Sequence, residues 1–138
     1  MSARALGLDL GAKRVGVAVS SGSVATPYEV IDRGRNHVVD HARVAALVEE
    51  TGAVVVVVGL PYSLDGSRGP AARLVEAEVE ELRAALAVPV ETWDERFTTV
   101  SADRSLMAQK LKAGARRRVV DKVAAAVMLQ SWVDAQVH

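Results

Sequence analysis

The segment from Ala5 to Ser20 constrains the fold more than any other part of the chain. Two apolar runs of strand length lie in it, separated by Gly11-Ala12-Lys13-Arg14, and a short glycine-containing connection of this kind is typical of a β-hairpin. Asp9 interrupts the first run, among leucines. Because a carboxylate buried alone in a central strand costs several kcal/mol, it needs a compensating partner. Asp9 is therefore a candidate metal ligand or phosphate-site residue, and the alternative is an aspartate at a strand end that accepts hydrogen bonds from the turn.

Length and composition predict a single domain over residues 1–138. Half of the 138 residues are hydrophobic and no change in composition marks a second domain, so the chain can bury one full core. The absence of cysteine excludes disulfides and thiolate chemistry. The sequence opens without a basic and apolar leader, and its apolar runs are too short for a bilayer. We expect a cytoplasmic protein that does not enter a membrane.

The rest of the chain predicts strands and helices in alternation. Pro27 suits an edge strand, Asn36 is a suitable N-cap, and Gly52 a suitable helix stop. Continuous valine from Val54 to Val58 indicates a strand covered on both faces. The expected later elements are strands over 24–31, 54–58 and 88–93, and helices over 36–51, 70–87, 100–111 and 120–136. Three antiparallel strands followed by this alternation predict an α/β fold, in which right-handed crossovers place helices on both faces of a mixed sheet.

The first predicted helix carries its apolar residues at helical spacing. These residues are Val38, Ala42, Ala45 and Val48, and such a spacing is the main sequence signal of an amphipathic helix.

Three acidic residues stand at positions where they can converge. Asp9 lies in the first strand, Glu95 just beyond the last strand, and Asp121 at the expected start of the last helix. A convergent carboxylate trio repels itself and favours a hard divalent cation, Mg²⁺ or Mn²⁺, and two such ions support phosphodiester cleavage. Because successive strand residues point to opposite faces, only one of Asp94 and Glu95 can enter the site, and we choose Glu95. The alternative for Asp121 is an acid that is favoured by a helix N-terminus.

Basic residues gather near the third of these acids, although the formal net charge of the chain is zero. We expect residues 113–118 to form a basic loop next to Asp121 and to meet phosphates, the alternative being an ordinary solvated loop. The candidate nucleic-acid contacts are Lys13, Arg14, Arg116, Arg117, Arg118 and Lys122.

Four motifs, in order, resemble those of the YqgF/RuvX family. They are Gly7-Leu8-Asp9-Leu10-Gly11 with Arg14-Val15-Gly16-Val17-Ala18, then Val58-Gly59-Leu60-Pro61, then Asp94-Glu95-Arg96-Phe97-Thr98-Thr99, and then Asp121-Lys122-Val123-Ala124-Ala125. The resemblance implies a ribonuclease H-like fold with a five-stranded sheet in the order 3-2-1-4-5. It also implies that Asp9, Glu95 and Asp121 are catalytic carboxylates that bind Mg²⁺ or Mn²⁺. The implied activity is a nuclease that acts on the precursor of 16S rRNA, with Holliday-junction DNA as the alternative substrate.

Two other functions are consistent with parts of the sequence. An Asp-x-Gly hairpin also opens actin-like nucleotide-binding proteins, but those proteins clamp nucleotide between two such domains, and this chain supplies one. A catalytically silent RNA-binding scaffold is the other alternative, and the presence of all three acids argues against it. A resolvase that cuts two symmetric strands needs a homodimer, whereas an RNA-trimming nuclease can act as a monomer.

Overall fold

The computed structural model describes residues 3–63, 65–97 and 113–136. The elements in chain order are β1 (Ala5–Leu10), β2 (Arg14–Ser21), β3 (Val24–Asp32), α1 (His37–Thr51), β4 (Val55–Leu60), α2 (Pro70–Ala85), β5 (Val90–Asp94), the 3-10 turn η1 (Glu95–Phe97) and α4 (Ala113–Ala135). The helix predicted over 100–111 lies outside the described residues. None of the described helices is long and apolar enough to cross a membrane.

The five strands form one mixed sheet in the order β3-β2-β1-β4-β5. β1 pairs with β2 in antiparallel orientation and with β4 in parallel orientation, which confirms the predicted topology. β3 and β5 are the edge strands. Pro27 lies in β3, next to a shift in register between Val17 and Ala18 of β2, and such an edge position tolerates the missing amide hydrogen of proline.

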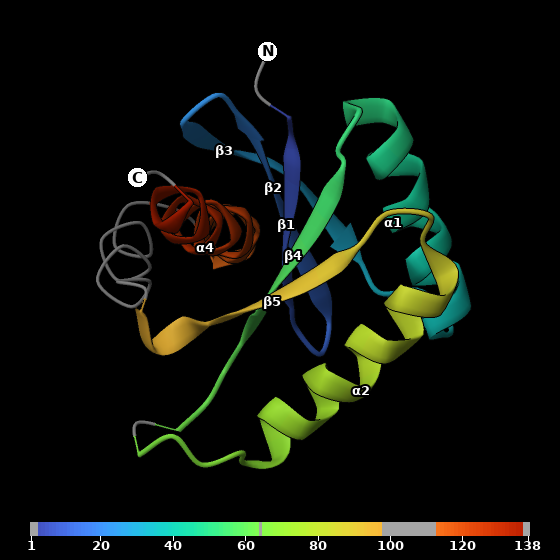
Figure 1. Ribbon diagram of the computed structural model, residues 1–138. Helices are drawn as coiled ribbons and strands as arrows, with labels where there is room; N and C mark the ends of the chain where they lie inside the picture. Colours follow the sequence, from blue (N-terminus) through green and yellow to red (C-terminus); the bar gives the residue numbers. More distant parts are fainter. Residues whose placement is uncertain (1–2, 64, 98–112, 137–138) are drawn as a thin grey trace.

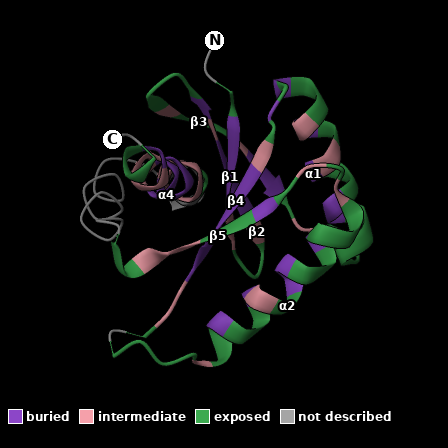
Figure 2. Ribbon diagram, viewed as in Figure 1, coloured by how far each residue is buried: buried purple, intermediate pink, exposed green. Residues whose placement is uncertain are grey.

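Helices cover both faces of the sheet, as predicted (Figure 1). α1 and α2 lie on one face and α4 on the other. Leu6 and Leu8 of β1 belong to the larger core beneath α1 and α2, whereas Ala5 belongs to the smaller core beneath α4. Because strand side chains alternate between faces, Gly7 and Asp9 share the α4 side with Ala5. Figure 2 shows the central strands β1 and β4 as mostly buried.

The ends of α1 are as predicted. The Asn36 side chain accepts a hydrogen bond from the Val39 amide at 3.0 Å, which satisfies one of the free amide groups of the first turn. Gly52 ends the helix with a φ of 73°, in the left-handed region that glycine adopts without strain.

The buried residues of α1 are not the apolar residues whose spacing predicted the helix. Val38 is 78% exposed. The buried residues of the helix are Asp40, His41, Val44, Leu47 and Thr51. The spacing therefore predicted the helix correctly, but the core-facing side contains polar residues that need partners elsewhere in the chain.

The basic loop predicted over 113–118 is wrong, because α4 already begins at Ala113. Asp121 lies inside this helix, two turns beyond its first residue, and is not at the helix start. Arginine has a high intrinsic helix propensity, and Arg116, Arg117 and Arg118 fit the helix without contributing apolar residues. The apolar periodicity begins only after them, which placed the predicted start too late.

Candidate active site

Asp9 lies between two strands that each contribute a glycine at its level. In the antiparallel pair of β1 and β2, Asp9 is opposite Gly16. In the parallel pair of β1 and β4, Leu8 aligns with Val58, the residue before Gly59. The residues next to Asp9 on both neighbouring strands are therefore glycines, which have no side chain.

The two glycines leave space for the other two predicted acids. A Cβ atom at Gly16 would lie 2.0 Å from the main-chain oxygen of Asp121, and one at Gly59 would lie 2.6 Å from Oε1 of Glu95. The backbone of α4 at Asp121 thus packs directly on β2, and the Glu95 side chain packs on β4. Because glycine permits such close approach, the Asp121 backbone and the Glu95 side chain lie over the strands on either side of Asp9, on the α4 side of the sheet. Among the described residues these three acids do not form a group whose donor atoms all lie within 4.8 Å of one another.

Asp94 has a different environment from its neighbour Glu95. Arg96 donates to Asp94 through its backbone amide at 2.9 Å and through Nη2 at 2.6 Å. These hydrogen bonds hold the pKa of the Asp94 carboxyl below its ordinary value. Trp93 packs against the α4 core, so strand alternation turns Asp94 to the opposite face. Of the two acids, Glu95 is the one beside Gly59.

Asp121 forms an ion pair with Arg14 of β2, whose Nε lies 2.6 Å from Oδ2. Both side chains are about one-quarter exposed, at 26% and 25%. Since Asp121 lies in the interior of α4, a helix N-terminus does not account for this acid. Arg14 therefore approaches one carboxylate of the group from the strand next to Asp9.

The donor chemistry of this group fits Mg²⁺ or Mn²⁺. Its three acids offer carboxylate oxygens, the hard ligands that these ions prefer. The glycine positions let two of these acids approach the sheet, since a Cβ atom at Gly16 would meet the Asp121 main chain and one at Gly59 would meet the Glu95 carboxylate.

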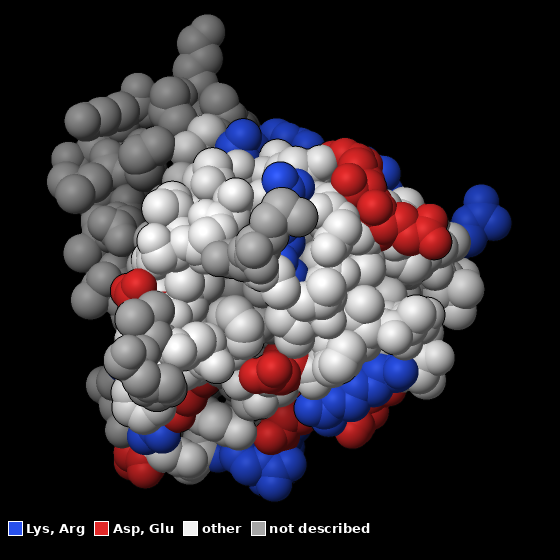
Figure 3. Space-filling model, turned by 45° about the horizontal axis from the view of Figure 1, so that its top comes forward, with Lys and Arg blue, Asp and Glu red and all other residues white. Residues whose placement is uncertain are grey.

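The other residues predicted to contact nucleic acid differ in their exposure and in their partners. Lys13 is exposed on the turn after β1, and Lys122 follows Asp121 with intermediate exposure. Arg118 is exposed and pairs with Asp32 at 2.9 Å. The side chains of Arg116 and Arg117 lie outside the described residues. On the face drawn in Figure 3, basic and acidic side chains alternate, and the described residues form no continuous basic surface there.

Comparison with known proteins identifies the relatives of this chain. The model of the family RuvX, described as Holliday junction resolvase, matches residues 3–135. The chain belongs to the RuvX family. A RuvX-family relative from Geobacillus thermodenitrificans is 43% identical and aligns over 96% of this chain and 99% of its own length. One from Myxococcus xanthus is 42% identical over 96% of this chain and 88% of its own. Both carry the name "Putative pre-16S rRNA nuclease".

A solved structure confirms the fold expected of a RuvX-family chain. RuvC from T. thermophilus, in complex with a Holliday junction substrate, superposes with a TM-score of 0.62 at 17% sequence identity, covering 98% of this chain and 96% of that one. At this level of identity the likeness concerns the fold, which is ribonuclease H-like.

Sequence reasoning missed a second group of polar residues, on the other face of the sheet. His41 and Glu78 are buried and lie 2.8 Å apart between α1 and α2. Two signals were available in the sequence. His37 and His41 are four residues apart, which places them on one side of a helix, and Glu78 interrupts the apolar side of α2 next to Val79 and Val75.

Proposed function

We propose that this protein is a divalent-metal-dependent nuclease that hydrolyses phosphodiester bonds in the precursor of 16S rRNA. The observation that carries the proposal is the grouping of Asp9, Glu95 and Asp121 over Gly16 and Gly59. The names of relatives that are 42–43% identical over almost the whole chain support the choice of RNA substrate.

In this proposal the three acids bind the metal ions and the nearby basic residues bind the substrate. Asp9 extends from the central strand, and Glu95 and Asp121 flank it, so that all three hold cations. Divalent ions, if held by these carboxylates, would supply Lewis-acid chemistry for the activation of water and the stabilisation of the leaving oxygen. Arg14, which pairs with Asp121, and its sequence neighbour Lys13, together with Lys122, would contact the phosphates on either side of the cleaved bond. The arginines at 116–118, in the first turns of α4, would add further phosphate contacts. Such contacts position the substrate without selecting its sequence.

Branched DNA is the second candidate substrate, because the family model is described as a Holliday junction resolvase. Cleavage of two symmetric strands would require a homodimer, whereas trimming of an RNA end is possible for a monomer.

The experiment compares the two substrates with one protein preparation. Precursor 16S rRNA and a four-way DNA junction are incubated with the protein in Mg²⁺, Mn²⁺, Ca²⁺ or excess chelator, and sedimentation gives the oligomeric state. We expect RNA cleavage in Mg²⁺ or Mn²⁺ and none with Asp9→Asn. Calcium should bind without supporting cleavage, because its longer bonds and flexible geometry misplace the attacking water. Cleavage of the junction alone would favour the second candidate, and full activity in chelator would exclude the metal-dependent mechanism.

A further inference from the structure

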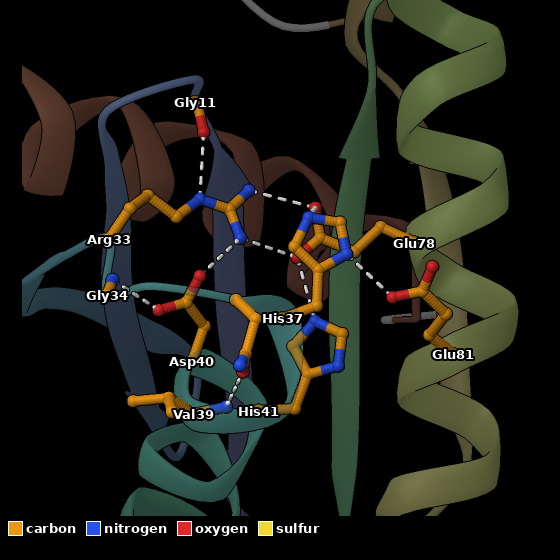
Figure 4. A network of polar contacts seen from close by, with 10 residues as sticks. Gly11, Arg33, Gly34, His37, Val39, Asp40, His41, Glu78 and Glu81 are labelled. Carbon is orange, nitrogen blue, oxygen red and sulfur yellow. Dashed lines mark hydrogen bonds and ion pairs between the residues drawn. The ribbon is translucent and has the colours of Figure 1, made fainter.

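Charged side chains meet between α1 and α2, on the face of the sheet opposite the candidate active site (Figure 4). His37 and His41 come from α1, and Glu78 comes from α2. One donor atom from each of these three residues lies within 4.8 Å of the other two. We propose that His37, His41 and Glu78 bind a divalent transition-metal ion, zinc, which links α1 to α2. This site is separate from the carboxylates of the proposed nuclease, and it does not rest on that function.

The spacing of the donor atoms suits a zinc ion. Bonds of about 2.0–2.1 Å in a tetrahedral site place neighbouring ligand atoms about 3.3 Å apart. His41 Nε2 lies 2.8 Å from Glu78 Oε2, and His37 Nε2 lies 3.9 Å from Glu78 Oε1. The two distances, each to a different oxygen of Glu78, lie on either side of the required value. Imidazole with carboxylate is a ligand set that zinc accepts, whereas Mg²⁺ favours oxygen ligands alone.

A second layer of contacts orients two of the proposed ligands. His37 Nδ1 lies 2.6 Å from Glu81 Oε1, which directs Nε2 of the same ring toward Glu78. Arg33 donates two hydrogen bonds to the Glu78 carboxylate, at 2.6 and 2.8 Å. Metal-binding histidines commonly donate their other ring N–H to a carboxylate, and metal-binding carboxylates are themselves hydrogen-bonded. Glu81 and Arg33 fill these two roles here.

The charges of the cluster favour a dication. Asp40 and Glu78 are only 4% and 5% exposed, and the half-exposed Glu81 beside them brings the negative charges of the cluster to three. Arg33, which contacts both Asp40 and Glu78, carries one positive charge. Because unbalanced charge in and around a buried group is costly, a divalent ion with two neutral imidazoles would balance Asp40, Glu78, Glu81 and Arg33 together. The ion would take the place of the hydrogen that His41 and Glu78 share.

A path from solution leads to this position. A groove of about 540 Å³ between the helices is lined by His37, His41 and Glu81 together with apolar residues of both helices, among them Val38 and Ala42. His37 is half-exposed in it. An ion can therefore enter without opening of the core.

The test is a zinc titration of the full-length protein, prepared without a histidine tag and stripped with a chelator. Calorimetry in excess Mg²⁺ keeps the carboxylate group on the other face occupied, and we expect one additional zinc ion per chain. Glu81→Gln should weaken zinc binding about 10–100-fold, as loss of a residue that orients a ligand does, and His37→Gln should weaken it further. His138→Gln is the matched control for the third histidine of the chain, and it should leave the affinity unchanged.

Two outcomes would overturn the site: no zinc binding by the unsubstituted protein, or equal zinc binding by His37→Gln. Because His37 is half-exposed, its substitution tests the site even if variants of the buried His41 do not fold. Co²⁺ provides a second measurement, with a tetrahedral absorption band expected in the unsubstituted protein and absent in His37→Gln. Asp9→Asn should keep its zinc affinity, so failure of the zinc site and failure of the nuclease function give different results.

Discussion

The two faces of the sheet handle negative charge in opposite ways. On the α4 side, Glu95 and Asp121 lie over Gly59 and Gly16, on either side of Asp9, and Asp121 remains about one-quarter exposed. On the other side, Asp40 and Glu78 are almost completely buried, and Arg33 pairs with both. Charge on the first face is partly exposed to solvent, whereas charge on the second face is held in buried ion pairs that join Arg33, α1 and α2. Substitutions on the first face should therefore remove activity, and those on the second should remove stability.

The largest expected effect is on catalysis, and it separates two adjacent acids. Glu95→Gln should lower the single-turnover rate of RNA cleavage in Mg²⁺ by about 10²–10³-fold or more, the range found when a group that stabilises the transition state is removed. Its Tm should change little. Asp94→Asn is the matched control, because Asp94 is held by Arg96, and it should retain most of the rate. Equal losses in the two variants would contradict the choice of Glu95.

The next effect is on stability, at the buried ion pairs of the opposite face. Burial raises the pKa of Glu78, but hydrogen bonds from Arg33 and His41 outweigh it, so that the pKa lies below its ordinary value. Arg33→Met would leave ionised carboxylates buried without this partner, and should lower the free energy of unfolding by about 3–5 kcal/mol. Urea unfolding in the absence of zinc measures it. A loss below about 1 kcal/mol would mean that the cluster is not held by Arg33.

A smaller effect on activity should follow from filling the space beside Glu95. Gly59 is not among the glycines with positive φ, so alanine can adopt its backbone conformation. The added Cβ would lie 2.6 Å from Glu95 Oε1 and must displace that side chain. A shift of about 1 Å costs on the order of 10²-fold in rate. Gly59→Ala should therefore slow cleavage while the protein remains folded, as circular dichroism would show, and an unchanged rate would place Glu95 outside the reaction.

Local sequence signals were sufficient for the framework that positions the first face. The glycine-containing turn predicted the β1–β2 hairpin, Asn36 and Gly52 predicted the ends of α1, and Pro27 predicted an edge strand. These signals act within a few residues of one another, through backbone geometry and capping. The alternation of side chains along a strand also indicated that only one of Asp94 and Glu95 can enter the site.

The second face could not be predicted in the same way, because its interactions join distant parts of the chain. His41 and Glu78 are 37 residues apart, and Arg33 and Glu78 are 45 apart. The apolar spacing of Val38, Ala42 and Ala45 gave no sign that Asp40 and His41 face the core, because the partners of these polar residues are distant in the sequence. The start of α4 was missed for a related reason, since its first turns contribute no apolar stripe.

The smallest expected effect on stability concerns the partly exposed ion pair of Arg14 and Asp121 on the first face. Arg14 and Asp121 are both about one-quarter exposed, and pairs in contact with water contribute about 0–1 kcal/mol. Arg14→Gln should therefore lower the free energy of unfolding by no more than about 1 kcal/mol in the same urea experiment. A loss as large as that of Arg33→Met would remove the contrast between the two faces.

The same variant should change how the active site responds to its ligands. With Nε of Arg14 at 2.6 Å from Asp121 Oδ2, the guanidinium would compete with a cation in the proposed metal site, so its removal should lower the Mg²⁺ concentration needed for half-maximal cleavage. If Arg14 also contacts a phosphate, the KM for RNA should rise, and the slope of log affinity against log salt should become shallower by about 0.7–0.9. A lower Mg²⁺ requirement with an unchanged salt slope would restrict Arg14 to the metal site. A collapse of the rate at saturating RNA and Mg²⁺ would instead mean that Arg14 stabilises the transition state itself.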